Sequence, residues 1–102
     1  MFDIDGKTYV LKYNLKRVEL IENTVGMPMM AELASHRGML GITALKSYFA
    51  YGLKEEGSDA FIAPKVGMKM ADDLIENEGY IKVNGAVIEA LQRDCPFFFQ
   101  GA

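Results

Sequence analysis

The chain has few of the side chains on which catalysis and metal binding depend. Its 102 residues include one histidine, His36, one cysteine, Cys95, and no tryptophan. A single imidazole excludes a zinc site built on paired histidines, and a single thiol excludes an internal disulfide or a cysteine knuckle. We interpret Cys95 as a small buried hydrophobe, and His36, beside Arg37 in a polar turn, as a solvated loop residue.

Long apolar runs and clustered positive charge are also missing. No window reaches the ~18 consecutive apolar residues of a membrane span, and the N-terminus lacks the basic and apolar segments of a signal peptide. The net charge is −3, and the longest basic grouping is Lys16–Arg17. Because phosphate binding needs clustered Lys and Arg, we expect no nucleic-acid partner, no membrane partner and a cytoplasmic location.

The chain does have the composition of one small globular domain. Half of its residues are hydrophobic and a quarter are charged, which is ordinary for a soluble fold. We expect a mainly α domain, with four to five helices and an N-terminal β-hairpin. In this interpretation residues 1–13 form the hairpin, residues 14–94 are helical and residues 95–102 form an apolar C-terminal tail.

The hairpin is predicted from alternating side chains on both sides of a turn. Phe2 and Ile4 alternate with polar residues, Asp5-Gly6 supplies two positive-φ positions, and Tyr9 and Leu11 alternate on the return. A lone hairpin is marginal in water, so one face must lie on helices or on another chain. Its edges are free to recruit a further strand.

Apolar residues at spacings of three and four predict the helices. The first begins after the cap Asn14 and ends at Gly26, and a short second one follows Pro28. Later helices are expected from residue 42 to 53, from residue 64 to Gly79, and from the cap Asn84 to residue 95. Residues 54–63 are expected to form a polar loop. The expected buried stripes are Leu15, Val18, Ile21 and Val25; Ile42, Leu45, Phe49 and Leu53; Val66, Met70, Leu74 and Ile75; and Val87, Ile88 and Leu91.

No set of residues converges on a catalytic or metal-binding pattern. Asp72 and Glu76 lie one helical turn apart and could hold Mg²⁺ or exchange protons, but that spacing equally describes the wet side of an amphipathic helix. The segment from Gly38 to Gly41 lacks the spacing of a nucleotide-binding loop. We therefore expect no enzyme activity, no metal and no cofactor.

Soft apolar side chains are unusually frequent. The chain has seven methionines, and this flexible, polarizable side chain suits surfaces that accept several partners, although it also fills irregular cores. Three consecutive phenylalanines near the C-terminus either pack back on the last helix or contact a partner chain. The candidate partner-binding residues are Met29, Met30, Tyr48, Tyr51, Phe97, Phe98 and Phe99.

The order of these signals resembles the tail assembly chaperones of long-tailed (siphophage-type) bacteriophages, prophages and gene transfer agents. The resemblance covers about residues 2–99, and the segment 27–40 is richer in methionine and glycine than the family pattern. The motifs that carry it are structural: Asp5-Gly6-Lys7, Tyr9 and Leu11-Lys12; Ile21-Glu22 and Gly26; Ile42, Ala44-Leu45 and Gly52-Leu53; and Asp73, Ile75, Gly79, Val83, Val87-Ile88 and Glu89-Ala90-Leu91.

The resemblance implies a function and partners. Members bind the tape measure protein, keep its hydrophobic helices soluble and recruit tail tube (major tail) subunits in the host cytoplasm, and they are absent from the mature virion. Homo-oligomers are plausible for the family. Many members also have a longer frameshifted form, for which consecutive phenylalanine codons at Phe98-Phe99 would be a suitable slippery site.

Two other function classes stay open. One is a small helical adaptor or regulatory module from a phage or mobile element, which gene neighbourhood would distinguish from a chaperone. The other is a metal-dependent enzyme or subunit that uses Asp72, Glu76 or His36. Substitution of Asp72 and Glu76 would distinguish such an enzyme from a chaperone, because a chaperone should lose almost none of its function.

Overall fold

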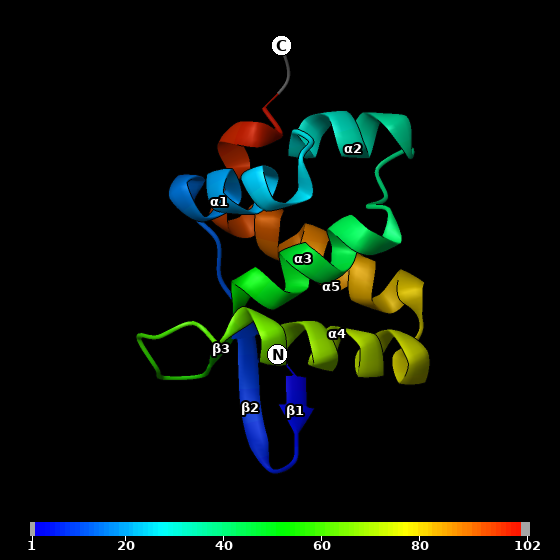
Figure 1. Ribbon diagram of the computed structural model, residues 1–102. Coiled ribbons are helices and arrows are strands. Elements are labelled where there is room, and N and C mark those ends of the chain that lie inside the picture. Colours follow the sequence, from blue (N-terminus) through cyan, green and yellow to red (C-terminus); the bar gives the residue numbers. More distant parts are fainter. Residues whose placement is uncertain (1, 101–102) are drawn as a thin grey trace.

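The computed structural model describes residues 2–100, and it confirms a mainly α fold with an N-terminal β-hairpin (Figure 1). Figure 1 places the hairpin at one end of the molecule, α1, α2 and η1 at the other, and α3 between them. The predicted tail residues 101–102 lie outside the described residues. In chain order the elements are β1 (Phe2–Ile4), β2 (Lys7–Leu11), α1 (Leu15–Val25), α2 (Met29–Ser35), α3 (Ile42–Gly52), β3 (Leu53–Glu55), α4 (Pro64–Glu78), α5 (Tyr80–Asp94) and η1 (Pro96–Phe98).

The hairpin forms as predicted. Asp5 and Gly6 have φ values of 50° and 80°, which is the positive-φ pair that a two-residue turn between antiparallel strands requires. The strands pair antiparallel, with Phe2 opposite Tyr9 and Ile4 opposite Lys7. Because side chains alternate along a strand, Phe2 and Ile4 lie on one face of the hairpin.

The prediction that residues 54–63 form a loop is wrong at its start. Leu53–Glu55 forms β3, which pairs antiparallel with β2 and gives a three-stranded sheet in the order β1-β2-β3. Helix α3 therefore passes directly into a strand after Gly52. A Cβ atom on Gly52 would lie 2.5 Å from the Tyr13 ring, so the absent side chain makes room for Tyr13 where helix becomes strand.

Helix α1 begins and ends at the predicted capping residues. The Asn14 side chain accepts a hydrogen bond from the Arg17 N–H at 2.7 Å, and Gly26 adopts a left-handed conformation with φ 83°. Val18 and Ile21 are buried, as predicted, but Leu15 is 61% exposed. Leu15 is the first residue of α1.

The core surrounds α3, whose buried face differs from the predicted stripe. Leu45, Phe49 and Leu53 are fully buried, whereas Ile42 is 50% exposed at the start of the helix. Ala44, Ser47, Tyr48 and Ala50 are buried in addition, because α3 packs against α1 on one side and against α4 and α5 on others. A helix covered on several sides does not show a single stripe.

Helix α4 approaches α3 through small residues. Val66 was predicted to be buried but is 53% exposed, and the buried positions of α4 are instead Gly67 and Ala71. Met70, Leu74 and Ile75 are half-buried against the core. Glycine and alanine allow two helix backbones to approach closely, which hydrophobic periodicity does not reveal.

The prediction that Asn84 caps the last helix is wrong. Only Gly79, with φ 96°, separates α4 from α5, and α5 already begins at Tyr80. Asn84 lies inside the helix and is 4% exposed. Its amide contacts the linker between α2 and α3, so the asparagine serves a tertiary contact and not a helix end.

Candidate functional site

A hollow on the described surface lies between the hairpin and the helices α4 and α5. It has a volume of about 450 Å³. We call this hollow the β1 groove. Its lining residues are Phe2, Asp3 and Ile4 of β1, Leu74 and Glu78 of α4, and Lys82, Val83 and Ala86 of α5.

Strand β1 forms one side of the groove, and its Phe2 side chain packs against the core. The Phe2 ring meets the Phe49 ring edge to face, with 5.4 Å between centroids, a favourable aromatic geometry. A second hollow of about 140 Å³ lies beside Phe2 and is lined by β2 and the later turns of α5, including Val10, Ala86 and Arg93. The hollows share Phe2 and Ala86, so they adjoin along α5.

The charged groups of the groove are mainly acidic or internally paired. Lys82 Nζ in the first turn of α5 lies 2.6 Å from Glu78 Oε1 at the end of α4. The Asp3 carboxylate accepts a hydrogen bond of 2.7 Å from the Thr8 hydroxyl, and no cation is within ion-pair distance of it among residues 2–100. Among the described residues, Asp3 is therefore the charged group of this site that has no ion-pair partner.

Arg93 and Asp94 fix the hairpin to the end of α5. Arg93 Nη2 donates to the Leu11 carbonyl oxygen at 2.6 Å, and the Asp94 carboxylate accepts from the Tyr13 N–H at 3.0 Å. Partial burial raises the pKa of Asp94, but the hydrogen bonds from Arg93 and Tyr13 outweigh this effect, and its pKa lies below the ordinary value. Leu11 and Arg93, which one of these bonds joins, both line the second hollow.

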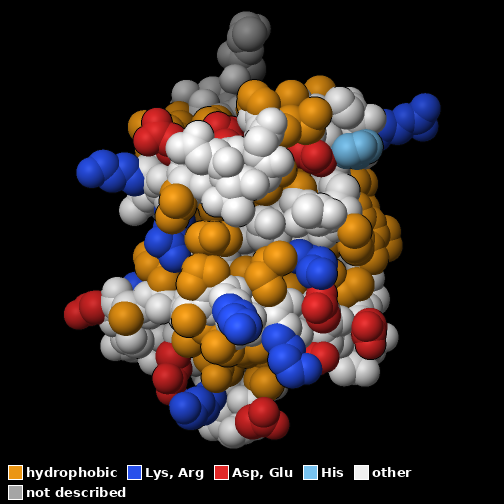
Figure 2. Space-filling view, viewed as in Figure 1, with side chains coloured by type: hydrophobic (Ala, Val, Ile, Leu, Met, Phe, Trp, Pro, Cys, Tyr) orange, Lys and Arg blue, Asp and Glu red, His pale blue; other side chains and the backbone are white. Residues whose placement is uncertain are grey.

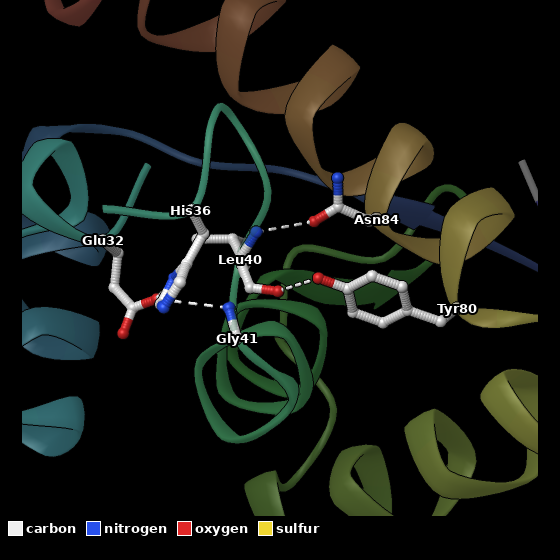
Figure 3. Close-up of polar contacts among 6 residues, drawn as sticks. All are labelled: Glu32, His36, Leu40, Gly41, Tyr80 and Asn84. Atoms are coloured by element: carbon white, nitrogen blue, oxygen red, sulfur yellow. Dashed lines mark hydrogen bonds and ion pairs between the residues drawn. The ribbon is translucent and has the colours of Figure 1, made fainter. Parts of the chain in front are cut away.

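The linker from His36 to Gly41, which joins α2 to α3, is held on two sides (Figure 3). The Leu40 N–H donates to Asn84 Oδ1 at 3.0 Å, and the Tyr80 hydroxyl donates to the Leu40 carbonyl oxygen. The Gly41 N–H donates to Glu32 Oε2 at 3.1 Å. Helices α2 and α5 therefore fix this linker from opposite directions, as Figure 3 shows.

The candidate enzymatic groups do not converge. The His36 side chain is 48% exposed and contacts Glu32 at 3.1 Å at the end of α2. Asp72 instead pairs with Lys46 of α3, at 2.6 Å. Within residues 2–100, no group of three or more His, Cys, Asp and Glu side chains is placed to hold a metal ion. Cys95 is fully buried, as predicted.

Two of the seven candidate partner-binding residues are buried in this structure and do not reach the surface. Met29 and Tyr48 are both 0% exposed. Met29 follows Pro28 at the start of α2, where its side chain turns into the core. Tyr48 lies on a side of α3 that other helices cover.

The other five candidates lie on three elements: Met30 on α2, Tyr51 on α3, and Phe97, Phe98 and Phe99 in or directly after η1. Met30 of α2 is 42% exposed and Phe97 of η1 is 48% exposed, whereas Phe98 and Phe99 pack back against the core. The Tyr51 carbonyl oxygen accepts from Arg17 Nε at 2.6 Å, and the Arg17 guanidinium lies over the Phe61 ring at 3.7 Å. The Arg17 guanidinium also lies 5.8 Å from the centroid of the Tyr51 ring, and this ring is partly buried against the core.

Sequence reasoning missed the β1 groove as a site. The feature of the sequence that could have indicated it is the predicted hairpin, because the apolar face of a lone hairpin must pack against another part of the protein or another chain. Which helices supply that cover, and where they leave a gap, depends on the packing of α4 and α5. No helix within residues 2–100 combines the length and the apolar character needed to cross a bilayer. Comparisons of the chain with protein-family models, with curated proteins and with solved structures found no significant match.

Proposed function

We propose that this chain binds other polypeptides and acts as a tail assembly chaperone of the long-tailed bacteriophage type. In this role it holds the tape measure protein and tail tube subunits in the host cytoplasm and is absent from the finished virion. The resemblance in sequence motifs supplies the family and the partners. The β1 groove, which lies beside a strand edge, is the structural observation that supports polypeptide binding.

The groove has the features of a polypeptide-binding surface. Its lining combines apolar side chains, among them Phe2, Leu74 and Ala86, with the charged side chains of Asp3, Glu78 and Lys82. Recognition of peptides commonly uses an apolar groove for side chains and an exposed strand edge for the backbone. Both elements adjoin here.

Exposed apolar side chains elsewhere provide further contact area. Leu20, Met27, Met30 and Phe97 are between 38% and 48% exposed. Figure 2 shows hydrophobic side chains gathered in patches on one face, with charged residues dispersed between them. Flexible methionines at such positions suit a surface that accepts hydrophobic helices of varied sequence.

Co-expression tests the proposal. A hydrophobic helical fragment of a tape measure protein encoded beside this chain should move from the pellet to the soluble fraction when the full chain is co-expressed, and should co-purify with it. Unchanged aggregation of the fragment would contradict the proposal. The gene should also lie between a tail tube gene and a long tape measure gene.

A pair of matched variants tests the groove in the same assay. Ala86→Lys places a long charged side chain in the groove, whereas Ala34→Lys makes the same change at an exposed position of α2. We expect Ala86→Lys to reduce the soluble fraction of the fragment and Ala34→Lys to leave it unchanged. Circular dichroism establishes that both variants remain folded before they are compared.

A further inference from the structure

The outer edge of β1 carries free backbone groups at one defined residue. The Glu56 N–H donates to the Thr8 carbonyl oxygen at 2.9 Å, so the backbone of Thr8 faces β3. Thr8 is the cross-strand partner of Asp3. Opposed residues in an antiparallel pair point their backbone groups either both toward each other or both outward, so the N–H and C=O of Asp3 face away from β2.

The β1 groove lies at this same edge. All three residues of β1 line it, and no residue of β2 does. Within the described residues β1 has β2 as its only strand neighbour. An added strand would therefore lie in the groove between β1 and helices α4 and α5, with its backbone against Asp3.

Side-chain alternation defines the sequence that fits. Asp3 points to one face of the sheet, and Phe2 and Ile4 point to the other, toward the helices. A residue directly opposite Asp3 would share its face, and the two residues flanking it would point with Phe2 and Ile4 toward the apolar lining. The geometry thus selects apolar flanks around a central residue that faces a carboxylate.

The charge of Asp3 identifies the central residue and disfavours a second copy of this chain paired symmetrically about Asp3. Symmetric antiparallel pairing of two β1 strands about Asp3 would place two carboxylates opposite each other, and directly opposed like charges destabilise a sheet. A lysine or arginine opposite Asp3 is instead favourable, because the Asp3 carboxylate has no cation partner within residues 2–100.

We propose that β1 accepts an antiparallel strand from a partner polypeptide, with a Lys or Arg opposite Asp3 and an apolar residue on each side of it. The proposal rests on the proposed polypeptide-binding function and names the mode and sequence of recognition. Backbone hydrogen bonds at Asp3 supply the pairing, and Leu74, Val83 and Ala86 contact the apolar side chains.

A peptide titration on the isotopically labelled full chain tests the proposal by nuclear magnetic resonance. The probe is a short acetylated peptide with a central lysine between two valines and threonines outside them, and its control has glutamate in place of lysine. The Asp3 amide signal should shift, and the lysine peptide should bind roughly fivefold tighter, which corresponds to one favourable cross-strand charge pair. Equal binding of the two peptides would overturn the proposal.

Asp3→Lys should reverse the preference between the two peptides, whereas Asp59→Lys, the same charge change on the loop after β3, should preserve it. An N-methyl group on the central lysine amide should abolish binding, because that N–H pairs with the Asp3 carbonyl oxygen. The same group on a flanking valine, whose N–H faces away from β1, should be tolerated. Loss of binding from both methylated peptides, or from neither, would contradict strand addition.

Concentration dependence and co-expression complete the test. A shift of the Asp3 amide with protein concentration alone would show that a second copy occupies the edge, and would overturn the proposal. If the chain solubilises tape measure fragments but Asp3→Lys and wild type do so equally, strand addition is wrong and the chaperone function stands. If the peptides bind as expected but the fragments still aggregate, strand addition stands and the chaperone function is wrong.

Discussion

Two buried tyrosines lie against each other but differ in how their hydroxyl groups are satisfied. The Tyr13 hydroxyl donates to the Tyr48 carbonyl oxygen at 2.7 Å, with ring centroids 6.5 Å apart. The Tyr48 hydroxyl is buried and has no hydrogen-bond partner among the described residues. A buried hydroxyl without a partner costs free energy, whereas a bonded one contributes modestly.

Removal of the two hydroxyl groups should have opposite effects. Tyr48→Phe should raise the free energy of unfolding by up to ~1–2 kcal/mol, because it removes a buried polar group that lacks a partner. Tyr13→Phe should lower it by ~1 kcal/mol or more, because the Tyr48 carbonyl loses its donor. Urea denaturation of both variants measures the difference, and destabilisation by Tyr48→Phe would show that its hydroxyl is bonded.

Gly67 should tolerate no side chain. A Cβ atom there would lie 2.8 Å from the Cα and carbonyl oxygen of Ala50, and these backbone atoms cannot move without separating α3 from α4. Gly67→Ala should destabilise the protein by ~1–3 kcal/mol through overpacking. Gly85→Ala is the matched control, since nothing lies within 4 Å of a Cβ at that helical position, and it should stabilise by roughly 0.5–1 kcal/mol. Thermal unfolding compares the two.

Asn84 should be essential for the linker between α2 and α3. Asn84→Leu leaves the buried Leu40 N–H without its acceptor, which should cost ~1–3 kcal/mol. Amide hydrogen exchange should accelerate at Leu40, whose N–H donates to Asn84 Oδ1 in the wild type. Asn77→Leu, an exposed position on α4, serves as the control and should leave exchange at Leu40 unchanged. Unchanged exchange in Asn84→Leu would contradict the role of this hydrogen bond.

Asp94 should make stability depend on acidic pH. Its pKa is lower in the folded protein than the ordinary value of 3.8, so the unfolded chain binds a proton more readily. The stabilisation is present above pH 3.8 and is lost as the pH falls through the folded pKa. Urea denaturation at a series of acidic pH values should show a shallower decline for Asp94→Asn than for wild type. Asp59→Asn should retain the wild-type slope, and an equal slope in Asp94→Asn would contradict the prediction.

Several local features were predictable because they depend on a few neighbouring residues. Asp5 and Gly6 tolerate the positive φ values of a tight turn, and Asn14 satisfies an N–H group three residues later. Gly26 ends α1 in a left-handed conformation. These interactions are complete within one turn of the chain, so the residue types alone specify them.

Burial on the covered helices was less predictable. Tyr48 and Met29 looked suitable for a partner by their chemistry, yet both are fully enclosed. Ile42 and Val66 looked suitable for the core, yet both are half exposed. Periodicity places residues on a face of a helix, but the number of faces covered depends on how many neighbours that helix contacts.

The sequence by itself determined the hairpin turn, most helix ends and the mainly α class, because backbone conformation and capping involve residues close together in the chain. The tertiary structure alone decided β3, the role of Asn84 and the β1 groove. Leu53 pairs with Leu11, and Asn84 binds the backbone of Leu40. Each of these contacts joins residues more than forty positions apart, and such pairs form only when the packing of the helices has brought them together.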